Sequence, residues 1–401
     1  MQTQHYPATD NFLEALLKSQ YTKLGPIFAD PEKYRLQVIY TRIDRDINQF
    51  PHFTDYHYGV SPDTYFYPAS TVKLPAAILA LEKLNDLQIP LLHRETPFFT
   101  APLQGVNTGV QRDPTAPGGI PTIANYIKKI FLISDNDAYN RLYEWIGQQP
   151  FNTRLWEMGY KDIQVRHRVG LPLHEEANRW TNPVSFRQDG EIIYQQDARY
   201  SRLSFPQRAD WAGTAYYNHL DQLEMRPMDF SFRNRLPLTD LHNLLRSIIF
   251  PEAVTISQRF RLTDSDYRFL YRCMSAYPTK EYKGYDPALH CQAYTKFLLF
   301  GGNRSSKIPE AVRIFNKPGW AYGFLTDTAY IVNLAEKTEF LLSASLFVNT
   351  SGILGDDHQA FEESGKPFLQ TLGEIIYKAE SERNRTVKPD LSRFNLSFDN
   401  A

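Results

Sequence analysis

The chain has 401 residues, of which 42% are hydrophobic, and its 44 Lys and Arg nearly balance its 45 Asp and Glu. This composition is typical of a globular protein, and the length allows one large domain or two to three ordinary ones. The near-neutral charge without a basic stripe argues against nucleic acid as a partner, and no apolar run reaches the length of a membrane span.

The first quarter of the chain predicts a helix, a strand pair and a second helix. Apolar residues repeat on one face of residues 9–19, with Thr9 or Asp10 as the cap. Residues 35–45 alternate between apolar and polar, as a strand does, and residues 52–60 fit as its hairpin partner. The apolar stretch at residues 74–84 then predicts a helix.

The middle of the chain alternates between loops and helices. Residues 90–119 are rich in Pro, Gly and Thr and predict a loop. Residues 164–235 have no clean periodicity, and residues 191–194 are their one candidate strand. Three helices are predicted between these two loops, at 121–133, 138–145 and 151–158.

The last part of the chain predicts two helices, three strands and a long closing helix. The helices are at 239–250 and 263–275, the strands at 311–316, 325–333 and 340–348, and the closing helix at 357–379. We expect the late strands to join the N-terminal strands in one antiparallel sheet, with the closing helix packed on it and an all-helical block in mid-chain. The predicted fold class is mixed α/β, of the α+β type.

Ser70 and Lys73 form the first candidate constellation, at the head of the predicted helix 74–84. Residues three apart share a helix face, so the Lys73 amine can reach the Ser70 oxygen. A serine hydroxyl becomes a nucleophile when a neighbouring base takes its proton. Lysine can be that base only where burial or nearby positive charge lowers its pKa. A helix-capping serine followed by a solvated lysine is the alternative interpretation.

Two further motifs follow. Ser134-Asp135-Asn136 comes after an apolar helix, where these residue types also serve as helix caps. Lys317-Pro318-Gly319 follows a predicted strand, where a turn lysine is the alternative. The order Ser-x-x-Lys, Ser-Asp-Asn, Lys-x-Gly is more specific than any one motif, and it is the signature of class A β-lactamases and penicillin-binding proteins. From about residue 34 to about residue 378, the chain therefore resembles the serine β-lactamase-like family.

The resemblance implies an antiparallel sheet flanked by helices plus an all-helical subdomain. Residues 1–33 would form an N-terminal helix and lead-in, residues 34–380 the catalytic domain, and residues 381–401 a polar tail. In the family, a loop that carries a catalytic carboxylate falls within the region 164–235. That region is longer here than the loop requires, so we expect an insertion at about 186–234.

By the same resemblance, Ser70 would attack a strained or activated carbonyl and become acylated. Lys73 would be the base or part of a proton relay; which group takes the proton is disputed for such enzymes. Ser134 would bridge Lys73 and Lys317 and pass a proton to the leaving nitrogen.

The remaining motif residues would bind substrate. Asn136 would hydrogen-bond a substrate amide and hold the Lys73 side chain. Lys317 would supply positive charge and attract a substrate carboxylate. Gly319 would let the strand backbone approach the substrate, since it has no Cβ. The backbone N–H groups of Ser70 and Trp320 would form the oxyanion hole.

Two departures from the family pattern bear on substrate and turnover. Pro318 replaces the usual Thr or Ser, so a hydroxyl that would bind a β-lactam carboxylate is missing, and no arginine between Phe324 and Ile331 substitutes for it. The Glu-x-x-Leu-Asn setting of the deacylating glutamate is also missing. Glu175 and Glu176 are the nearest candidate bases, with Asn178 as a partner amide, and an exposed acidic loop is the alternative.

These features predict a serine hydrolase that cleaves a β-lactam or a related amide. A D,D-peptidase or esterase on the same scaffold, or a penicillin- or peptidoglycan-binding sensor without turnover, remain alternatives. We expect a small-molecule or peptidoglycan-type substrate, no cofactor and a monomer. No Cys-x-x-Cys or His-x-x-x-His pair indicates a metal site.

The family usually works outside the cytoplasm, so a periplasmic or secreted location is expected. Residues 1–8 nevertheless lack the basic and apolar regions of a signal peptide. The two cysteines, Cys273 and Cys291, neither prove nor exclude a disulfide.

Overall fold

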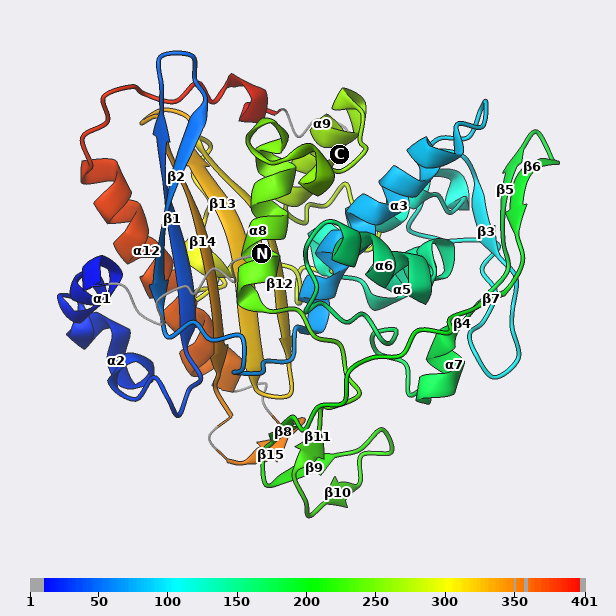
Figure 1. Ribbon diagram of the computed structural model, residues 1–401, viewed down its shortest axis with the longest axis horizontal. Coiled ribbons are helices and arrows are strands. Elements are labelled where there is room, and N and C mark those ends of the chain that lie inside the picture. The colour runs from blue at the N-terminus through cyan, green and yellow to red at the C-terminus, as the bar shows by residue number, and fades with distance from the viewer. Residues whose placement is uncertain (1–10, 350, 357–359, 397–401) are drawn as a thin grey trace.

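A five-stranded antiparallel sheet forms the centre of the computed structural model, which describes residues 11–349, 351–356 and 360–396 (Figure 1). The strand order is β12-β13-β14-β1-β2, so the N-terminal strand pair joins the three late strands as predicted. The strands are β1 (Gln37–Arg45), β2 (Pro51–Tyr58), β12 (Val312–Ala321), β13 (Phe324–Asn333) and β14 (Thr338–Phe347).

The sheet lies between two layers of helices, as the burial of its central strands indicates. Every residue of β13 is buried, as are nine of the ten residues of β14, so both faces of these central strands are covered. A tight turn with Tyr322 and Gly323 at positive φ joins β12 to β13, which is the backbone that a two-residue hairpin requires.

Three helices cover one face of the sheet: α1 (Asn11–Lys18), α2 (Tyr21–Ala29) and α12 (Lys366–Glu382). They lie at the left of Figure 1, and α12 contacts both β14 and α2. Their apolar faces and the sheet share one core cluster that includes Leu13, Ile331 and Leu372. The closing helix is therefore packed on the sheet, as the sequence predicted.

The opposite face carries α8 (Leu238–Ile249), which packs on β13, β14 and β1. Beyond it lies a helical block, at the right of Figure 1, which carries the first two sequence motifs. The helices of this block are α3 (Lys73–Leu87), α4 (Ile123–Ile133), α5 (Asn136–Ile146) and α6 (Gln148–Glu157), and α9 (Asp264–Ser275) is the helix next to it. A second, larger core cluster joins these helices to the sheet.

The remaining elements are short. The helices and helical turns are Ala69–Val72, Pro117–Gly119, α7 (Glu175–Arg179), Pro251–Ala253, Ile256–Gln258, α10 (Phe297–Phe300), Phe361–Gly365 and Ser392–Phe394. The strands are β3 (Phe98–Thr100), β4 (Trp180–Thr181), β5 (Val184–Gln188), β6 (Glu191–Gln196), β7 (Arg199–Tyr200), β8 (Trp211–Ala212), β9 (Ala215–Tyr217), β10 (Leu223–Glu224), β11 (Met228–Asp229) and β15 (Ile353–Leu354).

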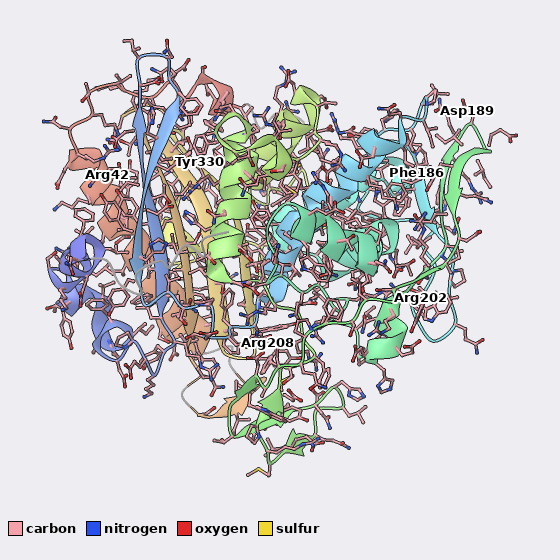
Figure 2. The ribbon with its side chains drawn as sticks, in the orientation of Figure 1. Arg42, Phe186, Asp189, Arg202, Arg208 and Tyr330 are labelled. Carbon is pink, nitrogen blue, oxygen red and sulfur yellow. The ribbon has the colours of Figure 1, made fainter. Side chains whose placement is uncertain are left out.

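The region of the predicted insertion, 186–234, falls into two parts. The β5–β6 hairpin, with Asp189 at its turn, pairs with β3, and Phe186 packs against Phe98 and Trp145 of the helical block (Figure 2). Strands β8 to β11 form a small lobe at the bottom of Figure 1, where β9 pairs with β15. The limits of the insertion and of the three predicted segments stay predictions.

Three local details differ from the sequence expectations. Ser70 lies in a 3₁₀ turn that precedes α3, and β12 runs on through the Lys317-Pro318-Gly319 motif. A π-helical turn, Phe361–Gly365, precedes α12. The predicted cap at Thr9 or Asp10 and the start of the predicted helix at residues 357–359 lie outside the described residues.

Within the described ranges, no helix is both long and apolar enough to cross a membrane. The same ranges contain no cluster of three or more His, Cys, Asp or Glu that could hold a metal ion. Cys273 and Cys291 are both free thiols.

Candidate active site

Ser70 lies at the junction of the helical block and the sheet. It occupies the 3₁₀ turn Ala69–Val72, and Ala69 just before it has a φ of 46°, an uncommon conformation for a residue with a Cβ. This turn contacts β12, which brings the first and third sequence motifs together. The Ser70 side chain lines a cavity of about 520 Å³ between the two layers.

Gly319 makes the close approach of β12 to Ser70 possible. A Cβ at residue 319 would lie 2.5 Å from the Pro68 carbonyl oxygen and 2.9 Å from the Ser70 backbone nitrogen. Real Cβ atoms do not come this close to backbone, so any other residue would force the strand away from the turn. The close approach that the structure shows is to the Ser70 turn, and the predicted approach of the strand to a substrate stays a prediction.

Lys73 is completely buried one turn after Ser70. Its Nζ donates to the Ser134 carbonyl oxygen and, over 2.6 Å, to Asn136 Oδ1. Burial lowers the pKa of Lys73 to about 7, against the opposing effect of the Asp135 carboxylate. A large share of the Lys73 amines is thus neutral near pH 7, as a proton acceptor must be.

Ser134 lies between the two motif lysines. It ends α4 with a left-handed backbone, φ 57°, and Asp135 then caps α5 by accepting the Ala138 N–H over 2.7 Å. The Ser134 Oγ accepts a hydrogen bond from Lys317 Nζ over 2.9 Å and lies 3.4 Å from Lys73 Nζ. The capping function and the bridging position therefore coexist in one motif.

Lys317 is also completely buried, and its Nζ donates to its neighbour's carbonyl, Pro318 O, over 2.8 Å. Burial and the nearby Lys73 hold the pKa of Lys317 well below its usual value. A third buried lysine, Lys296, lies close enough to lower it further, while Asp327 acts in the opposite direction. Lys73 thus discourages the Lys317 amine from carrying a proton.

The cavity walls come from five parts of the chain. Asn136 and Trp320 line it together with Ser70 and Ser134, so the structure brings these predicted site residues to one place, with the amines of Lys73 and Lys317 on Ser134. The other lining residues are Tyr67, Ala69, Ile133, Asp135, Val169, Gly170, His290, Tyr294, Ala321 and Tyr322.

Comparison with known proteins gives an independent result. A family model described as the β-lactamase enzyme family matches residues 47–201. The structure is similar to an ancestral class A β-lactamase of the last common ancestor of Gram-negative bacteria, with 15% identity, a TM-score of 0.50, and coverage of 91% of this chain and 99% of that one. A variant of that ancestor gives 15% identity, a TM-score of 0.51, and coverage of 92% and 99%.

The predicted resemblance to the serine β-lactamase-like family is confirmed. A comparison of the sequence with curated proteins found no match. At these low identities the solved structures establish the fold alone, which is the predicted mixed α/β fold with an antiparallel sheet.

In this β-lactamase-like fold, the segment after α6 forms one wall of the cavity. Val169 and Gly170 line the cavity, and a Cβ on Gly170 would lie 2.9 Å from the Asn136 Nδ2. The Asn140 side chain holds the Val169 backbone through two hydrogen bonds, of 2.9 and 3.0 Å. The wall is therefore built from backbone and small side chains.

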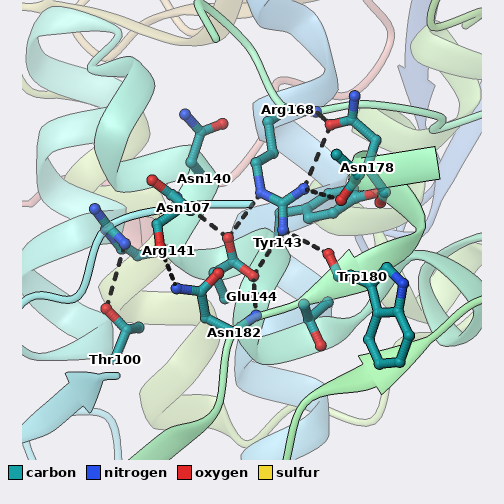
Figure 3. Close-up of polar contacts among 12 residues, drawn as sticks. Thr100, Asn107, Asn140, Arg141, Tyr143, Glu144, Arg168, Asn178, Trp180 and Asn182 are labelled. Atoms are coloured by element: carbon teal, nitrogen blue, oxygen red, sulfur yellow. Dashed lines mark hydrogen bonds and ion pairs between the residues drawn. The ribbon is translucent and has the colours of Figure 1, made fainter. Parts of the chain in front are cut away.

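A buried ion pair fixes this segment to α5 (Figure 3). Arg168 and Glu144 are both fully buried, and two parallel hydrogen bonds of 2.7 and 2.9 Å join them. Arg168 also donates to the Trp180 carbonyl over 2.6 Å, and Glu144 accepts the Asn182 N–H over 2.6 Å. The pair thus ties both ends of the segment 168–182 to one helix. Sequence analysis missed it, because the two residues are separated by 24 positions without a motif.

Glu175 and Glu176, the predicted candidate bases, do not line the cavity. The Glu175 carboxylate pairs with Arg179 over 3.1 Å, and Glu176 accepts a hydrogen bond from the Tyr200 hydroxyl over 3.2 Å. Their side chains are 42% and 68% exposed, respectively. Because both lie on the outward side of the short helix α7, the structure does not bring them to Ser70, and the surface interpretation fits better. The partner amide of Asn178 instead binds Arg168 backbone.

His290, Tyr294 and Tyr322 are cavity residues that sequence analysis also missed. His290 and Tyr294 lie in the irregular segment between α9 and α10, where no periodicity or motif marks them. Tyr322 lies at the β12–β13 turn, two residues after Trp320, so extending the third motif along its strand could have found it.

Proposed function

We propose that this protein is a serine hydrolase that forms an acyl-enzyme at Ser70 and cleaves a β-lactam or a related amide. The observation that supports this most is the bridging position of Ser134, whose Oγ accepts from Lys317 and lies 3.4 Å from the Lys73 amine in a cavity lined by Ser70. A hydroxyl between two buried amines is the arrangement that a proton shuttle requires.

In the acylation step, the neutral Lys73 amine takes the proton of the Ser70 hydroxyl, directly or through a relay. The Ser70 Oγ forms a bond to the substrate carbonyl carbon, and the carbonyl electron pair moves onto its oxygen. We assign the backbone N–H groups of Ser70 and Trp320 to that developing negative charge. One such donor is worth roughly 3–4 kcal/mol in enzymes where it has been removed.

Collapse of this intermediate breaks the carbon–nitrogen bond. The leaving nitrogen takes the proton of the Ser134 hydroxyl, and a proton from the Lys73 or Lys317 amine replaces it on Ser134. Lys73 carries the proton taken from Ser70 and can return it through Ser134, and the Lys317 Nζ donates to the same Ser134 Oγ over 2.9 Å. Asn136, which accepts from Lys73 over 2.6 Å, orients the base and faces the substrate amide.

A second candidate function is slow turnover, as in a penicillin-binding protein or sensor. Hydrolysis of the acyl-enzyme needs a base for water, and Asp135 is the one carboxylate among the lining residues in the described part of the chain. Its Oδ1 caps α5 and its Oδ2 lies 3.7 Å from Lys129, so it is already engaged. Lys73 would then have to serve both half-reactions.

The test is to incubate the protein with benzylpenicillin and a chromogenic cephalosporin, and to follow intact mass and absorbance. A Ser70-linked adduct with turnover supports the hydrolase, and a persistent adduct supports the slow-turnover candidate. Ser70→Ala should remove all labelling, whereas Ser305→Ala, at an exposed serine, should leave it unchanged. Labelling that survives in Ser70→Ala, or no adduct with the parent, would refute acylation at Ser70.

A further inference from the structure

A loop outside the three motifs carries a histidine to the cavity. His290 lies in the segment between α9 and α10, and it is one of the residues that line the cavity with Ser70. Its ring packs edge-on against Tyr294 at 5.0 Å, and Tyr294 packs edge-on against Trp320 of β12 at 6.1 Å. His290 is thereby placed next to the end of the strand that carries the third motif.

The position of the His290 ring is fixed by its own loop. Its backbone N–H donates to the Asp286 carbonyl over 2.7 Å, and its Nδ1 accepts the Asp286 N–H over 3.0 Å. Arg304 in turn donates to the carbonyls of residues 288 and 289. Such reciprocal bonds hold the imidazole in one orientation before any ligand arrives.

The same bonds determine which ring nitrogen carries the proton. A backbone N–H can only donate, so the Nδ1 of His290 must be the unprotonated nitrogen. Burial lowers the pKa of His290 below its ordinary value, so the ring of this buried residue is neutral near pH 7 with its proton on Nε2. This Nε2–H has no hydrogen-bond partner among the residues that the structure describes. A donor of this kind at a cavity wall needs an acceptor.

The strand motif lacks the donors that would otherwise bind an anionic substrate group. Pro318 has neither a hydroxyl nor an N–H, and β13 opposite it holds no arginine. The Lys317 Nζ already donates to Ser134 and to Pro318 O. An acceptor near Trp320 would thus find neither a hydroxyl at position 318 nor an arginine from β13.

We propose that the His290 Nε2–H anchors a carboxylate of the substrate from the loop side of the cavity, in place of the missing strand hydroxyl. This inference rests on the proposed acylation at Ser70 and names a binding residue for that site. The neutral imidazole would donate a hydrogen bond to the charged carboxylate, and the loop already holds the ring in place before the substrate binds. His290 is not the base for deacylation, because its Nδ1 accepts the Asp286 N–H and its Nε2 already carries the proton.

The test compares two substrates and two variants. The methyl ester of benzylpenicillin keeps the β-lactam ring and side chain but replaces the charged carboxylate by a neutral ester. His290→Phe keeps a ring against Tyr294 but removes the donor, and His290→Gln offers an amide N–H in its place. We expect His290→Phe to lower the second-order rate constant of Ser70 acylation by benzylpenicillin roughly 10- to 100-fold, with a much smaller effect on the ester. His290→Gln should recover part of the loss, and His174→Gln, at an exposed histidine, should change nothing.

Binding without reaction separates this inference from the proposed function. In a Ser70→Ala background, benzylpenicillin has no nucleophile to react with, and its dissociation constant can be measured by calorimetry. Adding His290→Phe should weaken this binding by the same factor as acylation. If the parent forms no adduct but binding in Ser70→Ala still depends on His290, the proposed acylation is refuted and the proposed binding role of His290 is supported. The proposed role of His290 would be wrong if His290→Phe slowed acylation by the acid and the ester equally, or slowed only deacylation. It would also be wrong if Ser70→Ala did not bind benzylpenicillin, or bound it equally well with and without His290→Phe.

Discussion

At the scale of single residues, Lys73 owes its proposed role to where it is buried. An exposed lysine is protonated at pH 7 and cannot accept a proton, whereas burial brings the pKa of Lys73 to about 7. We therefore expect the acylation rate of Ser70 to rise about tenfold per pH unit below pH 7 and to level off above it, because only the neutral amine accepts a proton. Stopped-flow labelling with a fluorescent penicillin between pH 5 and pH 9 measures this profile.

Lys83 is a matched control for Lys73, because it lies on the same helix and burial lowers its pKa to about 7 as well. Its Nζ binds Gln196 and packs on Trp145, away from the cavity. Lys73→Ala should abolish acylation while the protein stays folded by circular dichroism. Lys83→Met should leave the acylation rate and its pH profile as in the parent. A parental rate in Lys73→Ala would mean that another group is the base.

Gly319 offers a second prediction at this scale. In Gly319→Ala, the new methyl would meet the Pro68 carbonyl at 2.5 Å, so strand and turn must separate. We expect acylation to fall at least tenfold, since roughly 1.4 kcal/mol of lost positioning suffices, with a destabilisation of about 1–3 kcal/mol. Gly373→Ala in α12 is the matched control, because a Cβ there would lie 2.5 Å from the backbone nitrogen of Leu299 in α10, away from the cavity. It should lose stability in urea unfolding and keep the acylation rate of the folded protein; equal acylation losses in both would rule out a local effect.

The motif residues could be predicted from the sequence because, within each motif, the residues that act together are only a few positions apart. Ser70 and Lys73 are one helical turn apart, and Ser134 with Asn136 forms one tripeptide. Glu175 and Glu176 are predicted from residue type and position alone, and Arg179, three to four residues further along, gives both carboxylates a partner at the surface. His290 could not be predicted, because its place at the cavity depends on a loop without periodicity and on packing against Tyr294.

At the scale of elements, regular patterns were predicted well and irregular segments were not. The helices and strands of the sheet and the helical block carry apolar periodicity, since each buries one face or both. The cavity wall at residues 168–182 is held instead by polar bonds between distant residues, above all Arg168 with Glu144. Such pairs leave no periodic signal in a single sequence.

This ion pair gives a prediction for the wall segment. Arg168→Met leaves the Glu144 carboxylate buried and uncompensated, which typically costs about 3–5 kcal/mol. Glu144→Gln in the same chain removes that charge, so the double variant should be less destabilised than Arg168→Met alone. Urea unfolding measures the stabilities, and hydrogen exchange of residues 168–182 should rise in the single variant. Arg226→Met, at an exposed arginine, serves as the control. A cost below about 1 kcal/mol for Arg168→Met would contradict a structural role for the pair.

At the scale of the whole molecule, the cavity exists because two layers meet, and polar groups join those layers as well as apolar ones. His242 of α8 hydrogen-bonds Thr41 of β1 and Ser343 of β14, each at 2.7 Å. Burial and the neighbouring Arg246 lower the pKa of His242 to about 3, although Asp55 opposes this. The helix α8 is thus held on the sheet by a histidine that stays neutral over the physiological range.

The pH dependence of the unfolding free energy follows from the difference in proton uptake by His242 between the folded and the unfolded protein. Unfolded His242 takes up a proton near pH 6.5, whereas the folded protein takes it up only near pH 3. Acidification through this window therefore favours unfolding, by about 1.4 kcal/mol per pH unit from this group. Asp240 acts in the opposite direction, because burial raises its pKa to about 7 and the folded state then binds the proton first. The total pH dependence of stability is a balance of such groups, and only a variant isolates one of them.

His242→Gln isolates the histidine, because the amide keeps polar atoms between Thr41 and Ser343 and cannot titrate. At pH 7.5 the variant should be less stable than the parent, since its side chain fits the two hydroxyls less well. Between pH 6.5 and pH 4.5 the parent should lose stability relative to the variant, by about 2 kcal/mol at pH 5, because only the parent carries this proton linkage. Urea unfolding of both proteins across this range measures the difference, and His219→Gln, at an exposed histidine, should run parallel to the parent. A constant gap between parent and His242→Gln at every pH would mean that His242 takes up its proton equally in both states, and that the neutral ring does not hold the helix layer to the sheet.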